Sequence, residues 1–295
     1  MKRENMQFIE AKSILSKLRT DDPYFGITYN MNLYRGCQHA CIYCDTRSEC
    51  YGINDISKIS VKSNALELLT KELHTKRKAR ATIGTGSMND PYMPLEKDLE
   101  MTRRALQIIA FEKFPVHVIT KSDLVARDSD ILQEIAKTYA AVSFTITTYD
   151  DNMAKTLEPC APKSSDRFKA MEQLAKPGIY AGVTLMPVLP FINDTRENLE
   201  NIMIKAKDSG ASYVLFMPGM TLRKGSREYF YNAIDHHFPG VKEQYESYFS
   251  EKYICNSPNY RMLMNTFYNL ASKYGIETKI RFYQPAVNKQ LNLWG

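Results

Sequence analysis

The sequence predicts an α/β fold: a partial (β/α)6 barrel of the TIM type with parallel strands, followed by a helical carboxy-terminal region. Short apolar segments rich in β-branched residues alternate with amphipathic segments of helical period, and the alternation repeats six times. The length of 295 residues is common for a barrel that folds as one unit. Because right-handed crossovers curl a parallel sheet, six β/α units in series favour a barrel.

The six expected strands are short and bounded by turn residues. They cover residues 26–33, 81–85, 116–120, 141–147, 180–187 and 213–217. Several of the expected helices open with Ser, Thr or Asp, which cap the first turn of a helix. These helices cover residues 63–75, 97–111, 129–138, 164–175 and 195–208. The polar residues 1–18 are expected to form a helical start before the break at Asp21-Asp22-Pro23.

The sequence period changes beyond Pro218, where helical patterns follow one another. Residues 223–237, 241–249 and 258–273 are predicted to be helical, with 278–283 as one last strand. The chain lacks an internal repeat or a low-complexity linker, so we expect a single barrel with attached segments. These are an amino-terminal extension (1–25), the barrel (26–220) and a mostly helical region (221–295) packed on the barrel.

The composition is that of a globular protein and argues against disorder, with 44% hydrophobic and 24% charged residues. The net charge of +6 favours anionic partners, but it is spread along the chain and is explained most simply as solubility charge. Neither a signal-peptide pattern nor an apolar stretch of 18 residues occurs, so we expect a cytoplasmic protein that does not span a membrane. Six cysteines in that reducing compartment indicate metal binding or catalysis rather than disulfides.

Three of the cysteines form a C-x3-C-x2-C pattern directly after the first expected strand, at Cys37, Cys41 and Cys44. Barrels place their chemistry on loops at the carboxyl ends of strands, and soft thiolates select zinc, copper or iron–sulfur. A structural zinc site needs four protein ligands, whereas three thiolates fit a [4Fe-4S] cluster with one open iron. A Cys3His zinc site that recruits His39 remains an alternative, as do three unliganded thiols. Cys50, Cys160 and Cys255 are scattered and have no assigned role.

The cysteine motif, with the aromatic Tyr43 before its last cysteine, resembles the signature of the radical S-adenosylmethionine (SAM) superfamily. The resemblance implies a [4Fe-4S] cluster and SAM as cofactors, with the SAM amino and carboxylate groups on the open iron and Tyr43 near the adenine. It implies reductive cleavage of SAM to a 5′-deoxyadenosyl radical that abstracts hydrogen from a substrate. An electron donor such as flavodoxin or ferredoxin is then an expected partner.

Within the superfamily, residues 32–211 look most similar to the spore photoproduct lyase-like group. The similarity rests on short blocks that occur in the expected order. They are Asn32-Leu33-Tyr34-Arg35-Gly36-Cys37, Asn89-Asp90-Pro91-Tyr92 with Pro94 and Glu96, Thr120-Lys121-Ser122, Glu158-Pro159 with Pro162 and Arg167, and Pro187 with Pro190-Phe191-Ile192-Asn193-Asp194. By this resemblance Gly86 and Ser87 lie near the methionine end of SAM, Lys121 pairs with its carboxylate, and Ser143 contacts its ribose.

The sequence departs from spore photoproduct lyase in one respect. That enzyme carries a cysteine in the loop after the second strand, which returns hydrogen to the product radical, but residues 84–90 contain no cysteine. We therefore expect a radical SAM enzyme of lyase or transferase type, with its substrate and hydrogen donor unassigned. A spore photoproduct lyase-like enzyme of nucleic-acid repair or modification is a narrower alternative. A non-enzymatic zinc-binding adaptor is an alternative of another class.

Overall fold

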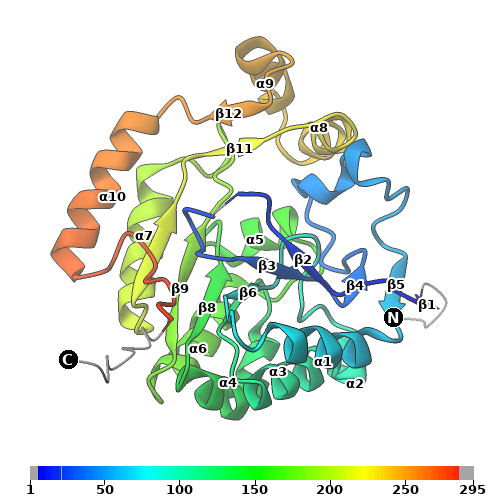
Figure 1. Ribbon diagram of the computed structural model, residues 1–295. Coiled ribbons are helices and arrows are strands. Elements are labelled where there is room, and N and C mark those ends of the chain that lie inside the picture. Colours follow the sequence, from blue (N-terminus) through cyan, green and yellow to red (C-terminus); the bar gives the residue numbers. More distant parts are fainter. Residues whose placement is uncertain (1–5, 21, 286–295) are drawn as a thin grey trace.

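The computed structural model describes residues 6–20 and 22–285, and a seven-stranded sheet forms its centre (Figure 1). The strand order is β10-β9-β8-β7-β6-β3-β2. The strands are β2 (Leu15–Lys17), β3 (Tyr29–Met31), β6 (Ile83–Gly84), β7 (Val116–Thr120), β8 (Ala140–Thr145), β9 (Tyr180–Leu185) and β10 (Tyr213–Phe216). All of them except the edge strand β2 run parallel to their neighbours. The sheet is not closed, which confirms the predicted partial barrel with six parallel strands.

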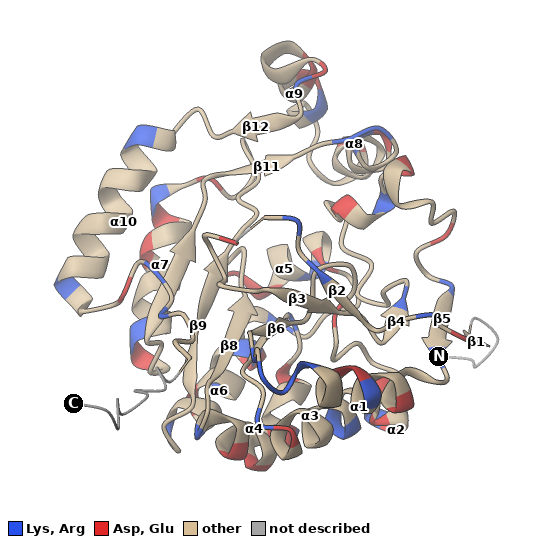
Figure 2. Cartoon of the chain, viewed as in Figure 1, with Lys and Arg blue, Asp and Glu red and all other residues tan. Residues whose placement is uncertain are grey.

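Helices cover the outer face of this sheet (Figure 1). They are α1 (Ala65–Lys76), α2 (Glu96–Leu99), α3 (Met101–Phe111), the 3-10 helix η4 (Asp123–Asp128), α4 (Ser129–Ala136), α6 (Ser164–Ala175) and α7 (Arg196–Asp208). The short helix α5 (Asp151–Leu157) instead packs with the cysteine loop in a second apolar cluster. Val118, Val142 and Phe144 point outward from the strands into the main hydrophobic core. Lys, Arg, Asp and Glu lie mostly on the helices and loops rather than on the central strands (Figure 2). This arrangement follows from a parallel sheet whose outer face is buried under helices.

The carboxy-terminal region adds a short antiparallel pair and three helices. They are β11 (Gly219–Thr221), β12 (Ile254–Asn256), α8 (Ser226–His237), α9 (Val241–Phe249) and α10 (Tyr260–Tyr274). Residues of α10 share the main core with α7, whereas α8 and α9 form a second apolar cluster that contains Cys41, Ile42 and Tyr43. The region after residue 218 therefore packs directly against the predicted cysteine loop.

Two predicted elements are wrong because long-range pairing overrides local pattern. Where residues 1–18 were expected to be helical, the described part forms β1 (Met6–Ile9) and β2. β1 pairs with β5 (Ile59–Lys62), and β2 with β3. No strand forms within the described residues 278–283; instead Glu277 makes an isolated bridge to Tyr213. The predicted helix 97–111 is also interrupted at Glu100, which has a φ of +51°.

A second, smaller sheet stands beside the barrel opening and carries the cysteine loop. Its order is β1-β5-β4, where β4 (Tyr34–Arg35) ends two residues before Cys37. Two 3-10 helices, η2 (Asp45–Arg47) and η3 (Glu49–Tyr51), follow Cys44. Among the described helices, none has the length and apolar character needed to cross a membrane.

Candidate functional site

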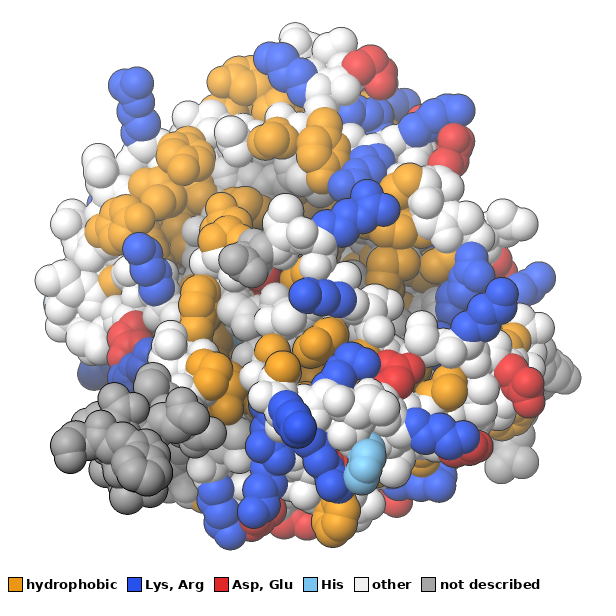
Figure 3. Space-filling model, in the orientation of Figure 1, with side chains coloured by type: hydrophobic (Ala, Val, Ile, Leu, Met, Phe, Trp, Pro, Cys, Tyr) orange, Lys and Arg blue, Asp and Glu red, His pale blue; other side chains and the backbone are white. Residues whose placement is uncertain are grey.

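A cavity of about 600 Å³ opens at the carboxyl ends of the parallel strands. The cysteine loop and the segments that follow β6, β7, β9 and β10 line it. The face shown in Figure 3 combines apolar side chains with Lys and Arg side chains. This end of a barrel is where loops from neighbouring strands can bring their side chains together.

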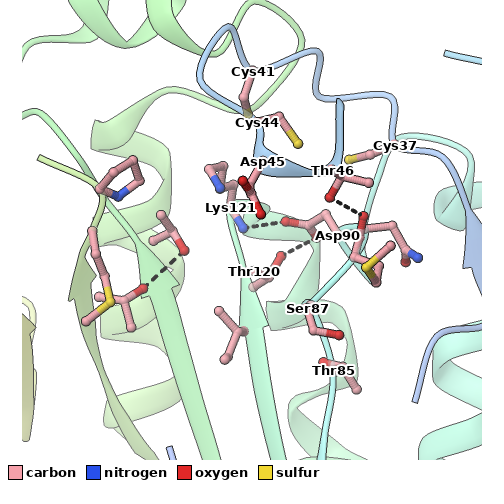
Figure 4. A pocket seen from close by; sticks show the side chains of 18 of the residues that line it. Cys37, Cys41, Cys44, Asp45, Thr46, Thr85, Ser87, Asp90, Thr120 and Lys121 are labelled. Carbon is pink, nitrogen blue, oxygen red and sulfur yellow. Dashed lines mark hydrogen bonds between the residues drawn. The ribbon is translucent and has the colours of Figure 1, made fainter. Parts of the chain in front are cut away.

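The structure brings Cys37, Cys41 and Cys44 together along one side of this cavity (Figure 4). All three are free thiols; Cys41 is buried, while the other two are partly exposed. The loop turns sharply at Gly36, whose φ is +89°. A Cβ atom at Gly36 would lie 2.7 Å from the carbonyl oxygens of Ile56 and Lys58, so only glycine fits this approach.

Backbone hydrogen bonds fix the other end of the loop to the segment after α5. Ile42 N–H donates to Leu157 O at 2.9 Å, and Cys160 N–H donates to His39 O at 3.1 Å. The phenol of Tyr43 donates to Glu158, whose carboxylate forms an ion pair with Arg167. Backbone and side-chain hydrogen bonds thus fix the conformation of the loop that carries the three thiols.

The donor set of this loop fits a soft, thiolate-bound metal centre. Burial, and then the charge of Asp90, raises the pKa of the Cys37 thiol to about 11, and burial also raises the pKa of Cys41 well above its ordinary value. These thiols are therefore protonated near neutral pH and must release protons to bind a metal. A centre bound here would have three protein thiolates.

His39 does not complete a zinc site in this structure. Its ring is buried, with Nε2 3.3 Å from Asp90 and Nδ1 3.4 Å from the carbonyl oxygen of Cys160. Both ring nitrogens thus face Asp90 and the Cys160 carbonyl rather than the three thiols, whereas a mononuclear tetrahedral zinc site needs four ligands around one position.

Asp90 connects the loop after β6 to the end of β7. It accepts hydrogen bonds from Thr120 Oγ1 and Lys121 N at 2.6 Å, and from Tyr92 N at 2.9 Å. Burial opposes its ionisation, but His39 and these hydrogen bonds hold the pKa of Asp90 well below its usual range. Asp90 is therefore an ionised link that positions Lys121 and His39.

The predicted residues Gly86, Ser87 and Lys121 all line the cavity, and Figure 4 shows the side chains of Ser87 and Lys121. Gly86 has a φ of +86°, and a Cβ there would lie 2.3 Å from Ile119 O. The Lys121 ammonium lies 5.6 Å from the centre of the Tyr43 ring. Burial disfavours its charge, but the carboxylates of Glu158 and Asp90 contribute to a raised pKa of Lys121, so it stays cationic. A cation beside three thiols suits an anionic ligand group.

Ser143 lies deeper in the barrel than the sequence suggests. Its hydroxyl is bonded to His117 Nε2 at 2.8 Å and to the Tyr213 hydroxyl at 2.7 Å, and it is not among the residues that line the cavity. Thr145, two residues later on the same face of β8, does line it and is bonded to Thr184 at 3.1 Å. The sequence does indicate Thr145 as a candidate, because side chains alternate along a strand and Ser143 and Thr145 share a face.

Four methionines that no sequence motif indicated also line the cavity. Met88 and Met186 come from separate segments, whereas Met217 and Met220 lie three residues apart, directly after β10 and within β11. Thioethers give the cavity adaptable apolar lining. Cys50, Cys160 and Cys255 lie outside the lining.

Comparison with known proteins gives a family match over most of this region. Residues 31–220, more than half of the chain, match the family model described as the radical SAM superfamily. An uncharacterized protein of Methanocaldococcus jannaschii is 35% identical over 172 residues, which are 57% of this chain and 63% of that relative. The match thus spans less than two thirds of that relative's length. An uncharacterized protein of Mycobacterium tuberculosis is 28% identical over 273 residues, which are 90% of this chain and 79% of the relative.

The fold is similar to that of spore photoproduct lyase. Its structure in complex with dinucleoside spore photoproduct superposes with a TM-score of 0.70 at 14% sequence identity. The similarity covers 91% of this chain and 79% of the lyase chain. At this level of identity the likeness concerns the fold, including the open sheet with helices on its outer face.

Proposed function

Since this chain belongs to the radical SAM superfamily, we propose that Cys37, Cys41 and Cys44 are the three thiolate ligands of its [4Fe-4S] cluster. Members of the superfamily use this cluster and SAM, and the chain shares these cofactors. One observation carries the assignment of the ligands: the three thiols line a single cavity together with the partly buried ammonium group of Lys121. Three thiolates leave one iron of a cubane without a protein ligand, which is where SAM can bind.

When bound, the cluster and SAM supply reductive cleavage of the sulfonium and a 5′-deoxyadenosyl radical that takes hydrogen from the substrate. The residues of the chain bind and orient these groups. Lys121 pairs with the carboxylate of SAM, the turn at Gly86 and Ser87 admits its methionine end, and Tyr43 packs beside its adenine. Thr145 and Thr184 present hydroxyls at the depth where Ser143 was expected to meet the ribose. The methionine-lined part of the cavity is left for the substrate.

The proposal is tested by SAM cleavage. Protein reconstituted anaerobically with iron and sulfide is expected to make 5′-deoxyadenosine from SAM in the presence of dithionite. Cys41→Ala is expected to lose both the iron and the product. Cys160→Ala is the matched control, because that thiol is exposed and outside the cavity lining. Protein that binds iron stoichiometrically and never cleaves SAM would overturn the enzymatic assignment.

A second candidate function is the modification of nucleic acid. Arginines stacked on tyrosines stand near the cysteine loop: the Arg47 guanidinium lies 3.7 Å above the Tyr229 ring, and Arg223 lies 4.9 Å from Tyr253. Basic and aromatic side chains in alternation suit single-stranded nucleic acid. Salt-dependent binding of a single-stranded oligonucleotide, weakened by Arg223→Ala, would support this function. No retention at low ionic strength would exclude it.

The substrate can be sought with the same assay. Candidate substrates that carry deuterium at the position of hydrogen abstraction transfer it into 5′-deoxyadenosine. The compound that donates this label is the substrate, and the structure of its product decides between a lyase and a transferase type of reaction. The physiological electron donor, which we expect to be a flavodoxin or ferredoxin, would replace dithionite in that assay.

A further inference from the structure

A fully buried ion pair lies directly behind the cysteine loop. The side chains of Glu158 and Arg167 are both 0% exposed. Arg167 also donates to Thr145 O at 2.9 Å and to Pro162 O at 2.6 and 3.0 Å, so its guanidinium is held on several sides. The Arg167 guanidinium, itself held by these hydrogen bonds, therefore fixes the position of the Glu158 carboxylate.

The remaining contacts of Glu158 point to the site. Its carboxylate accepts the phenol proton of Tyr43, which stands between Cys41 and Cys44 in the sequence. Burial opposes ionisation, but Arg167 and Lys121 lower the pKa of Glu158, so the carboxylate carries its charge. The ion pair thus contacts the cysteine loop through the Tyr43 hydrogen bond and interacts electrostatically with Lys121.

A contribution to stability does not by itself explain why this ion pair is buried. The desolvation of two buried charges offsets most of their attraction, and packed apolar residues of similar volume often stabilise a protein equally well. A charge buried near a metal centre has another effect, because the reduction potential of an iron–sulfur cluster depends on nearby charge and hydrogen bonds.

We propose that Glu158 and Arg167 are positioning residues that orient Tyr43 toward SAM, and that their opposite charges have opposing effects on the reduction potential of the cluster. This inference rests on the proposed function, in which Cys37, Cys41 and Cys44 hold that cluster. The negative charge of Glu158 disfavours the reduced cluster, the positive charge of Arg167 favours it, and the two effects nearly cancel in the native protein. The pair therefore holds Tyr43 by an ionic contact without a large change in the potential.

The test is a redox titration of the reconstituted protein without SAM. Glu158→Gln is expected to shift the reduction equilibrium about tenfold toward the reduced cluster, which is about 59 mV for a one-electron couple. Arg167→Gln is expected to shift it in the opposite direction. The double variant Glu158→Gln/Arg167→Gln is expected to return to within about twofold of the native value. A residue with a merely structural role would not give shifts of opposite sign that cancel.

The control is an ion pair outside the cavity lining. Arg77 and Glu112 form an ion pair through the guanidinium Nε and Nη2 atoms, at 2.5 and 2.8 Å. Glu112→Gln should lower the stability and leave the potential unchanged. Single variants at 158 and 167 that shift the potential in the same direction, or less than twofold, would overturn the inference. Native protein that binds no cluster would overturn the proposed function itself.

Tyr43→Phe tests the positioning role without leaving a buried charge unpaired. Both members of the ion pair remain, and only the hydrogen bond to the loop is removed. We expect SAM to bind about tenfold more weakly, measured by equilibrium dialysis, while the potential stays within about twofold of native. SAM affinity equal to that of the native protein would show that the pair does not act through Tyr43.

Discussion

Gly86→Ala offers a sharp test of the site geometry, because the chain contains a matched control. Gly86 has a φ of +86°, and an added Cβ would lie 2.3 Å from the carbonyl oxygen of Ile119. Gly178 has nearly the same φ, +85°, and nothing within 4 Å of its Cβ position. The two substitutions share the backbone strain, and only Gly86→Ala adds a clash with backbone.

The magnitude follows from these two contributions. An alanine held at positive φ costs about 1 kcal/mol, which is the effect expected for Gly178→Ala. The clash at Gly86 forces a shift of β7 or of the turn, and overpacking of this kind costs about 1–3 kcal/mol more. Gly86→Ala should therefore lower the free energy of unfolding by about 2–4 kcal/mol. In a chain of 295 residues this is a fall in Tm of about 3–7 °C.

The assay is thermal and urea unfolding of both variants beside the native protein. SAM affinity is measured in the same samples, and only Gly86→Ala should weaken it, since Gly178 is not a residue of the cavity lining. Equal losses of stability in the two variants would refute the contact with Ile119. Native SAM affinity in Gly86→Ala would refute the role of this turn in binding.

Three further predictions concern single side chains. Burial lowers the pKa of His117 to about 4, so the neutral ring contributes stability that is present above pH 6.5 and is lost as the pH falls toward 4. The loss in the free energy of unfolding is about 3 kcal/mol. Urea titrations of His117→Gln at several pH values should lack this part of the pH dependence. A native-like pH profile in His117→Gln would contradict this. Lys121→Met should weaken SAM binding about thirtyfold or more, measured by equilibrium dialysis, because it removes the partner of a carboxylate; a change below threefold would reassign the lysine. Thr145→Val should weaken SAM binding about fivefold for one lost hydrogen bond, and Ser143→Ala much less; the reverse order would restore Ser143 as the ribose contact.

The barrel strands could be predicted because each carries its own pattern. The strand 213–217 and the helix 164–175 are continuous local signals, and the structure places β10 and α6 there. The strands β1 and β2 escaped prediction because their pairing partners, β5 and β3, lie 12 or more residues away. Pairing at that range leaves little trace in a local window.

The residues of the candidate site also differ in how far the sequence could predict them. The three cysteines could be predicted because they occupy one loop whose spacing is readable. The position of Ser143 outside the cavity lining could not be predicted. The period of a strand shows which face a side chain is on, but not how far along the strand the cavity extends. Glu158 and Arg167 stand over a hundred residues from Tyr43 in the sequence, and only the fold shows that they meet the cysteine loop.

The central claim is that a loop with three thiolates leaves one iron for SAM, and electron–nuclear double resonance tests it most directly. The reduced cluster is examined with SAM labelled with 17O in the carboxylate and 15N in the amino group. We expect hyperfine couplings from both labels, which require direct coordination to iron. A reduced cluster without either coupling, while SAM is bound, would contradict the account.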